Sequence, residues 1–233
     1  MLALAAALVG LAAAAPLPDL DQAPPFGVSV VERNHRTLLV FGSAVDNIGP
    51  GELLVQAARA GGALRTWQVV GRRRYPLPVH LRYVRSETHQ HWHFPGFERY
   101  ELRRLDGSLV GRDRKTGFCL RDAYETRALN RKPVWTSECA RHRPGARSLQ
   151  QGISAGFGDD YVPAKEGQAI DVTGLPAGRY VLVHRVNPDR VLREASYAND
   201  AASVLLELRG SKVSVVARCP DSARCGTRRL RRV

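Results

Sequence analysis

Short stretches in which apolar and polar side chains alternate recur along most of the chain, and many are rich in valine and leucine. Glycine, proline, asparagine and aspartate cluster between them, as in residues 46–51 and 173–178. The pattern predicts many short strands joined by tight turns, which is typical of an antiparallel β-sandwich. The expected strands are Val28–Glu32, Thr37–Phe41, Glu52–Val55, Thr66–Val70, His80–Val84, Phe97–Leu102, Tyr180–Val186, Ala202–Leu208 and Lys212–Val216.

The segment from Gly111 to Lys165 departs from this pattern. It is rich in glycine, arginine, aspartate and serine, shows weak periodicity and holds two of the four cysteines. We expect a long disulfide-tethered excursion that carries active-site residues on a mainly β scaffold. At 233 residues and 44% hydrophobic, the chain can bury one sizeable core, so a single domain is the simplest organisation.

The first residues predict export. Leu2–Ala15 is almost entirely alanine, leucine, valine and glycine, so residues 1–15 are expected to be a signal peptide. This run is too short to span a bilayer, and no other apolar run is long enough, so we expect a secreted, extracellular protein that is not transmembrane. Neither lysine nor arginine occurs before Arg33, so the basic residues that usually begin a signal peptide are missing. This pattern is typical of a leader that has lost its first residues.

The four cysteines form an even set without CxxC spacing. In an exported chain such a set favours two disulfides, for which three pairings exist. Proximity along the chain favours Cys119 with Cys139 and Cys219 with Cys225. Closing the first loop would stabilise the fold by about 3 kcal/mol in the chain-entropy model.

The net charge of +13 comes almost wholly from arginine. Clusters at residues 72–74 and 228–232 predict electrostatic contact with anionic cell-wall or extracellular polymers. No recognition helix, zinc finger or aromatic RNA-binding motif accompanies the charge, so specific nucleic-acid binding is not expected.

Three histidines alternate at His89, His91 and His93, which places their side chains on one face of an extended backbone. The outer two would stand about 13 Å apart on a flat strand. A metal lies about 2 Å from each imidazole nitrogen. The backbone must therefore twist, bulge or end there, and Pro95-Gly96 can break the strand. Imidazole ligands favour copper, zinc or nickel, although two of the three could instead be exposed polar residues.

Two further residues offer chemistry. Lys115 is the one lysine among three arginines in residues 111–122, and an amine can lose its proton and act as a nucleophile where guanidinium cannot. Tyr161 follows two carboxylates, Asp159 and Asp160. Taken alone, the lysine is a surface charge and the tyrosine a loop anchor.

The three segments together resemble the catalytic domain of the lysyl oxidase family. In chain order they read His-x-His-x-His, then Lys-x-x-Phe-Cys-Leu-x-Asp, then Gln-Gly-hydrophobic-Ser-x-Gly-x-x-Asp-x-Tyr. Further matching blocks extend the resemblance over nearly the whole mature chain. They are Leu17–Leu20, Leu38–Phe41 through Asn47–Gly49, Ile170–Thr173, Pro176–Tyr180, Val186–Pro188 and Glu194–Asn199. Residues 16–218 would then be the catalytic domain of a secreted, bacterial-type member, and residues 219–233 a basic tail.

The resemblance implies a copper amine oxidase. His89, His91 and His93 would bind copper, and Lys115 and Tyr161 would form the lysine tyrosylquinone crosslink after oxidation of the tyrosine by dioxygen. Primary amines, among them peptidyl lysine, would become aldehydes with release of ammonia and hydrogen peroxide. Asp159 matches a motif aspartate and is the candidate general base, although a turn-capping role is as plausible.

The chain also departs from the family pattern. Thr88 and Phe157 stand where animal members have cysteines, so a smaller disulfide set must hold the site. A locally acidic mouth formed by Asp159, Asp160 and Glu87 would offset the repulsion between a cationic amine and a basic protein. The alternative hypotheses are a non-enzymatic copper-binding cell-surface module without the quinone and a zinc hydrolase.

Overall fold

A computed structural model describes residues 14–60, 63–86, 89–113, 117–127, 131–163 and 167–226. Most of the expected leader lies outside these residues, as do Glu87, Thr88, Lys115 and the last seven residues. The described chain forms seventeen strands. It contains no helix that is long and apolar enough to cross a membrane.

The strands are short, apart from a long β3. They are β1 (Leu20–Gln22), β2 (Phe26–Arg33), β3 (Arg36–Asn47), β4 (Leu53–Ala60), β5 (Ala63–Val70), β6 (Arg73–Pro76), β7 (Arg82–Arg85), β8 (Gln90–His93), β9 (Glu98–Arg103), β10 (Leu109–Arg112), β11 (Tyr124–Glu125), β12 (Ser148–Ile153), β13 (Phe157–Tyr161), β14 (Ala169–Asp171), β15 (Gly178–Val186), β16 (Ala201–Arg209) and β17 (Lys212–Cys219).

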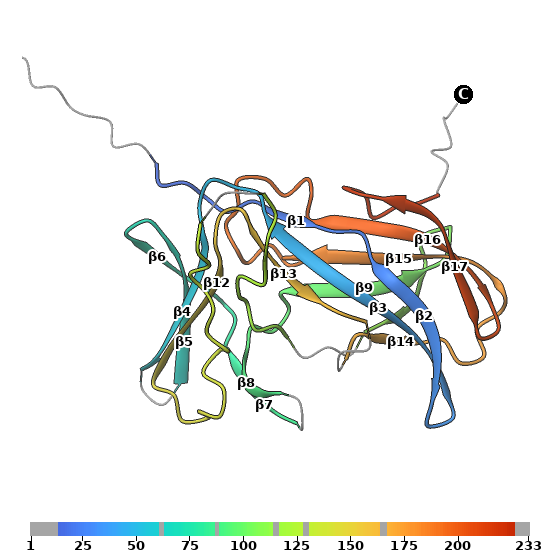
Figure 1. Ribbon diagram of the computed structural model, residues 1–233, viewed down its shortest axis with the longest axis horizontal. Coiled ribbons are helices and arrows are strands. Elements are labelled where there is room, and N and C mark those ends of the chain that lie inside the picture. The colour runs from blue at the N-terminus through green and yellow to red at the C-terminus, as the bar shows by residue number, and fades with distance from the viewer. Residues whose placement is uncertain are drawn as a thin grey trace, which may run out of the picture.

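Two antiparallel sheets face each other and form the sandwich that the alternating pattern predicts (Figure 1). One sheet is built around β3, which pairs with β1, β2, β13 and β14. The other runs in the order β10-β9-β15-β16-β17. Between them, the Phe41 ring lies 5.1 Å from the ring of Tyr100 and 4.9 Å from that of His184. The expected mainly β fold is confirmed.

The apolar sequence of β3 follows from its position in the fold. Its middle is buried at every position from Leu39 to Val45 rather than at every second one, because other chain segments cover both of its faces. Gly42 belongs to this run, and a Cβ atom there would lie 2.3 Å from the Phe26 ring. Glycine is therefore required for β2 to pack against β3.

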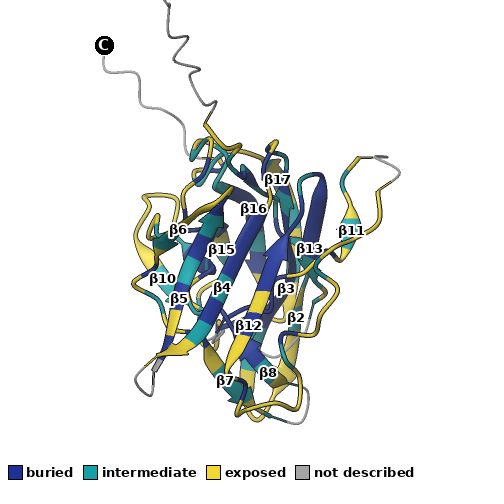
Figure 2. Cartoon of the chain, turned by 90° about the vertical axis from the view of Figure 1, so that its left-hand side faces the viewer, coloured by how far each residue is buried: buried dark blue, intermediate teal, exposed yellow. Residues whose placement is uncertain are grey.

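A third sheet, in the order β12-β4-β5-β6, and the β7–β8 hairpin lie at one end of the sandwich (Figure 1). Leu53, Val55 and Ala57 of β4 belong to the main hydrophobic core. The face of this sheet that Figure 2 turns to the viewer alternates between buried and more exposed residues. This sheet therefore extends the core toward the hairpin that carries the histidines.

Both expected disulfides are confirmed, joining Cys119 to Cys139 and Cys219 to Cys225. The first closes a loop within the segment from Gly111 to Lys165, because its two cysteines are 20 residues apart. The second folds the chain back after β17, so that Cys225 packs against Val181, Val183 and Leu205.

The middle segment is more regular than expected. All nine expected strands overlap observed ones, but residues 111–165 also contain β12 and β13, which pair with β4 and β3 respectively. Their buried polar residues, such as Gln151 and Asp159, hide the apolar pattern of a strand. The turn expected from residue 46 also starts later, because Asp46 and Asn47 still belong to β3.

Glu194 makes stability depend on pH. Burial raises its pKa from 4.5 to about 8, with a further contribution from the charge of Asp200. Between these two values the folded chain keeps a proton that the unfolded chain releases, so the free energy of unfolding should fall as the pH rises through this window. Urea unfolding in chelator-containing buffer should show the fall. Glu194→Gln should reduce the slope but not abolish it, because burial also raises the pKa of Asp21 to about 6 and that of Asp200 to about 7. The exposed Glu52→Gln should leave the wild-type slope.

Candidate metal and quinone site

The three histidines meet at the start of β8. His91 and His93 lie within the strand, whereas His89 precedes it. One ring nitrogen from each lies within 4.8 Å of the others. The ring centroids are 4.7 Å apart for His91 and His93, and 5.3 to 5.4 Å for the pairs with His89. Bound nitrogens would be about 4 Å apart or less, so a small inward turn of the rings would allow all three to ligate one ion.

The backbone leaves the strand where the geometry requires. Because β8 begins at Gln90, His89 is not held at the extended spacing that would keep the outer rings far apart. The turn at Pro95-Gly96 is also present, with Gly96 at φ 72°, but it follows the trio. The expected break thus lies at both ends of β8, and the one before Gln90 brings His89 to its partners.

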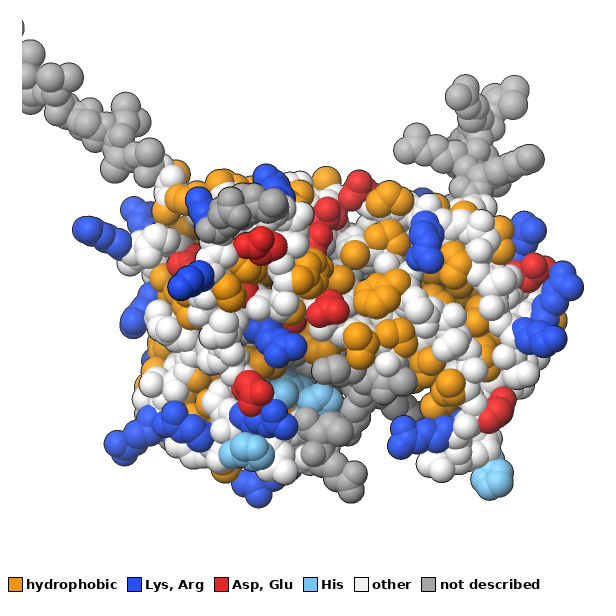
Figure 3. All heavy atoms as spheres, in the orientation of Figure 1, with side chains coloured by type: hydrophobic (Ala, Val, Ile, Leu, Met, Phe, Trp, Pro, Cys, Tyr) orange, Lys and Arg blue, Asp and Glu red, His pale blue; other side chains and the backbone are white. Residues whose placement is uncertain are grey.

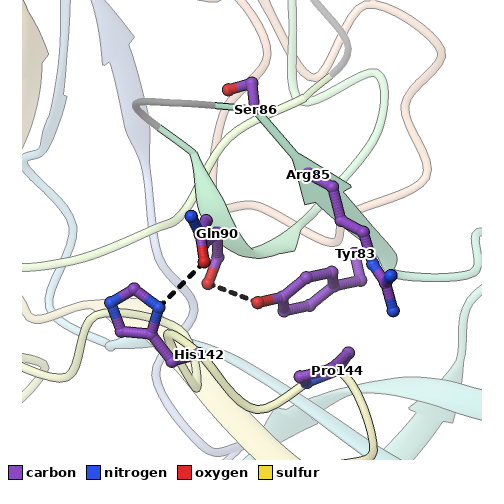
Figure 4. A pocket seen from close by; sticks show the side chains of 6 residues that line it. All are labelled: Tyr83, Arg85, Ser86, Gln90, His142 and Pro144. Carbon is purple, nitrogen blue, oxygen red and sulfur yellow. Dashed lines mark hydrogen bonds between the residues drawn. The ribbon is translucent and has the colours of Figure 1, made fainter.

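Strand β8 is also held by backbone hydrogen bonds to Cys139 and the loop that follows it. Trp92 N donates to Cys139 O at 3.0 Å, and His142 N donates to Gln90 O at 2.7 Å. Figure 4 shows the His142 ring against the Gln90 side chain, 3.0 Å from its Oε1, and the Tyr83 hydroxyl donating to Gln90 O at 2.8 Å. The disulfide to Cys119 fixes this loop, so it also steadies the strand that presents the histidines.

The segment Gly117–Asp122 connects the histidines to the tyrosine. Phe94 N donates to Phe118 O at 2.7 Å, and Phe118 N donates back to Phe94 O at 3.1 Å. Gly117 passes so close that a Cβ atom there would lie 3.0 Å from the Cβ of His93 and 2.7 Å from Phe94 O. Lys115 stands two positions earlier in the sequence and lies outside the described residues.

Tyr161 is the last residue of β13, and its ring packs edge-on against Phe118 with 5.0 Å between centroids. Its hydroxyl lies 3.1 Å from Cys119 O and 3.2 Å from Asp159 Oδ2, so its single proton can be donated to either. Asp159 is buried, and Arg121 Nε lies 3.9 Å from its Oδ1. The structure thus brings together Tyr161 and the candidate base.

The surroundings keep the phenol protonated. Burial raises the pKa of Tyr161 well above 10, and the negative charge of Asp159 adds to the rise, while Arg121 opposes it. Glu98 contributes from the facing sheet, where its carboxylate accepts a hydrogen bond from Ser43 Oγ at 2.8 Å. Ser43 is the cross-strand partner of Tyr161. A partly buried, neutral phenol therefore lies among carboxylates, with one arginine nearby.

The expected acidic mouth does not form from Asp159 and Asp160. Adjacent residues of a strand point to opposite faces, so Asp160 points away from the side of β13 that carries Asp159 and Tyr161. Asp159 is 2% exposed and close to Arg121, so it presents little negative charge to solvent. Glu87 lies outside the described residues.

Several site-building residues stand in the sequence motifs, but sequence reasoning assigned them no role. Asp122, Gln151 and Ser154 connect the two motif segments, and Arg121 faces Asp159. The sequence offered one indication that Asp122 has a role, because it is a carboxylate at the end of an arginine-rich run. The orientation of Arg121 toward β13 has no signal in sequence, because it depends on the packing of two segments far apart in the chain.

The fold and the site define an all-β protein with a cluster of three histidines that could hold a metal ion, connected through Gly117–Asp122 to a partly buried tyrosine. A family model described as lysyl oxidase matches residues 63–219, which is most of the chain and includes the three histidines, Lys115, Asp159 and Tyr161. The chain belongs to the lysyl oxidase family.

Individual relatives agree with this assignment. Lysyl oxidase homolog 3A of Danio rerio is 28% identical over 180 residues, which cover 77% of this chain and 20% of that protein. Lysyl oxidase homolog 3 of Homo sapiens is 26% identical, with coverages of 78% and 20%. Protein-lysine 6-oxidase of Rattus norvegicus is 28% identical, with coverages of 79% and 38%. The chain thus spans only a fifth to two fifths of the length of these relatives.

Copper binding should depend on all three histidines. Replacing His89, His91 or His93 by alanine should each weaken Cu(II) binding by more than the roughly 10- to 100-fold that loss of an outer-shell partner costs. Competition against a chelator of known affinity would measure this. His80→Ala is the matched control, because His80 contacts Leu64 O on the third sheet and is not part of the trio. Wild-type affinity in any of the three variants would remove that histidine from the site.

Proposed function

We propose that this chain is a secreted copper- and quinone-dependent oxidase that converts primary amines, with peptidyl lysine as the substrate class, to aldehydes with release of ammonia and hydrogen peroxide. The observation that carries the proposal is the convergence of three histidines and a partly buried tyrosine on one short segment, Gly117–Asp122. Family membership supports the same chemistry. The names of the relatives, among them a protein-lysine 6-oxidase, support lysine as the substrate.

The three imidazoles suit copper, since nitrogen ligands favour it over calcium or magnesium. Copper bound there would activate dioxygen for oxidation of the Tyr161 ring. In that oxidation the ring gains one oxygen atom from dioxygen and loses two hydrogens, and the second oxygen atom leaves as water. The neutral amine of Lys115 then adds to the ortho-quinone ring. A second dioxygen removes two hydrogens from the adduct and leaves as hydrogen peroxide.

The chain offers a base for the later amine oxidation. The Asp159 carboxylate lies beside the Tyr161 hydroxyl and can take a proton from a substrate held at the ring. Arg121, about half exposed, places its Nε 3.9 Å from Asp159 Oδ1.

The surface is consistent with an extracellular role in which charge governs association. Lys and Arg side chains are spread over the face in Figure 3, with acidic side chains interspersed among them and among hydrophobic atoms. We propose that the net charge of +13 gives electrostatic contact with anionic wall or extracellular polymers. The leader-like residues 1–15 support export, with residues 16–218 as the catalytic domain and the last residues as a basic tail.

Formation of the crosslink tests the proposed function. After aerobic loading with Cu(II), peptide mapping by mass spectrometry should show Lys115 joined to Tyr161, with the mass of one extra oxygen and four fewer hydrogens. Lys115→Arg and Tyr161→Phe should each abolish the crosslink and leave copper affinity unchanged, because neither residue is a ligand. Lys132→Arg and Tyr197→Phe are the matched controls and should crosslink normally. Two unlinked peptides in the wild type would leave a copper-binding module without oxidase activity.

The role of Asp159 can be separated from that of the quinone. Asp159→Asn should keep the crosslink but lower kcat for a peptidyl-lysine substrate by roughly 10²- to 10⁴-fold, because the amide cannot accept the substrate proton. Peroxide release measured against quinone content would give the turnover per active site. Asp160→Asn, on the other face of β13, should change kcat little; equal losses in both variants would argue for a general electrostatic effect.

A further inference from the structure

The carboxylate of Asp122 accepts four hydrogen bonds, which is more than an exposed surface carboxylate needs from the protein. Its Oδ2 accepts from Val134 N at 2.7 Å, from Trp135 N at 3.1 Å and from Ser154 Oγ at 2.8 Å. Its Oδ1 accepts from Ser154 N at 2.7 Å. The side chain is buried, so these four donors replace the water that a free carboxylate would bind.

The four bonds join three segments that also meet through backbone bonds such as Asp122 N to Trp135 O at 2.9 Å, and the carboxylate is the one group here that bonds to all three. Asp122 ends the segment that starts at Gly117, Val134 and Trp135 precede Cys139, and Ser154 lies between β12 and β13. Next to the carboxylate, Leu120 N donates to Gln151 Oε1 at 3.0 Å and Gly152 N donates to Leu120 O at 3.3 Å. The segment Gly117–Asp122 is thereby fixed along the chain that leads into Tyr161.

The same segment carries both contacts that relate the tyrosine to the histidines. At its start, Phe118 pairs with Phe94, the residue after His93. In its middle, Cys119 O lies 3.1 Å from the Tyr161 hydroxyl. Asp122, at its end, touches neither group. A shift of Asp122 along the chain would move Phe118 and Cys119 together and so change the position of the Tyr161 ring relative to the metal ligands.

We propose that Asp122 is a positioning residue for oxidation of Tyr161: its carboxylate holds the segment Gly117–Asp122 against Ser154, and this sets the tyrosine ring beside the copper ligands. The inference rests on the proposed function and deepens it. The step that depends on this position is the insertion of one oxygen atom of dioxygen into the ring. In this step one ring hydrogen and the hydroxyl hydrogen leave, together with the second oxygen atom, as water. Catalysis by the finished cofactor depends on it less, because the crosslink then fixes the ring covalently.

The test compares the rate of Tyr161 oxidation at saturating Cu(II) in the full chain. Asp122→Ala should slow formation of the crosslink by roughly 10- to 100-fold, as for loss of a partner that orients a ligand, while copper affinity stays within a few-fold of the wild type. The crosslinking rate of Asp122→Asn should lie between those of Asp122→Ala and the wild type, because its amide oxygen can still accept from Val134 N, Trp135 N and Ser154 Oγ. Ser154→Ala, which removes only one of the four bonds, should slow the reaction in the same direction and serves if Asp122→Ala does not fold.

A matched control separates positioning from general destabilisation. Glu101 is also a buried carboxylate, but it pairs with Arg103, Arg112 and Arg185 on the facing sheet. Glu101→Gln should lower the melting temperature yet form the crosslink at the wild-type rate. Hydrogen exchange should rise at residues 117–122 and 90–94 in Asp122→Ala and stay unchanged in β15 and β16.

The outcomes are distinct. If the wild type forms no crosslink, the proposed function fails and this inference with it. If the wild type reacts and both Asp122→Ala and Ser154→Ala react equally fast, only the positioning role is overturned. If Glu101→Gln slows the reaction as much as Asp122→Ala at a similar melting temperature, the effect is one of stability and the positioning role is again overturned.

Discussion

The reciprocal pair of backbone hydrogen bonds between Phe94 and Phe118 is the contact on which the rest of the site depends. It joins the strand that carries the histidines to the segment that receives the Tyr161 hydroxyl. Because backbone bonds do not depend on side-chain rotamers, they fix the two segments to within a fraction of a residue. The edge contact of Phe118 with Tyr161 and the close passage of Gly117 beside His93 both follow from this pairing.

Burial shapes the chemistry of the tyrosine as much as its position. The ring is partly buried and its hydroxyl lies next to Asp159, so the neutral phenol is favoured and its pKa is raised well above 10. Asp159 lies in the same environment and remains close to Arg121, which offsets part of its desolvation. The network that surrounds the site is correspondingly polar: Asp122, Gln151 and Ser43 are all buried and all bonded to neighbouring segments. These bonds allow polar residues to occupy the core that an apolar chain would fill more simply.

Alternation and turn residues were sufficient to predict the β-sandwich, because strand period and turn chemistry are local properties. Both disulfides were also predictable, since neighbouring cysteines in an exported chain have few partners within reach. Strands β12 and β13 were not predicted, because residues such as Gln151 and Asp159 are buried only through partners elsewhere in the chain. The expectation that Asp159 and Asp160 share an acidic mouth was wrong for a related reason: the alternation of β13 separates Asp160 from Asp159, and the position of Arg121 could not be read from its neighbours. Glu87, the third candidate, lies outside the described residues.

The sequence by itself determined the chemical inventory of this protein: three imidazoles at alternate positions, a phenol that follows two carboxylates, and the motif order that marks the lysyl oxidase family. Only the tertiary structure decided how these parts meet. His89 lies next to its partners because β8 starts one residue later. Tyr161 is linked to the β7–β8 hairpin through the segment Gly117–Asp122, which contacts both. Residue types and their spacing are encoded locally, whereas the distance between segments 70 residues apart is set by which backbone groups find hydrogen-bond partners when the core closes.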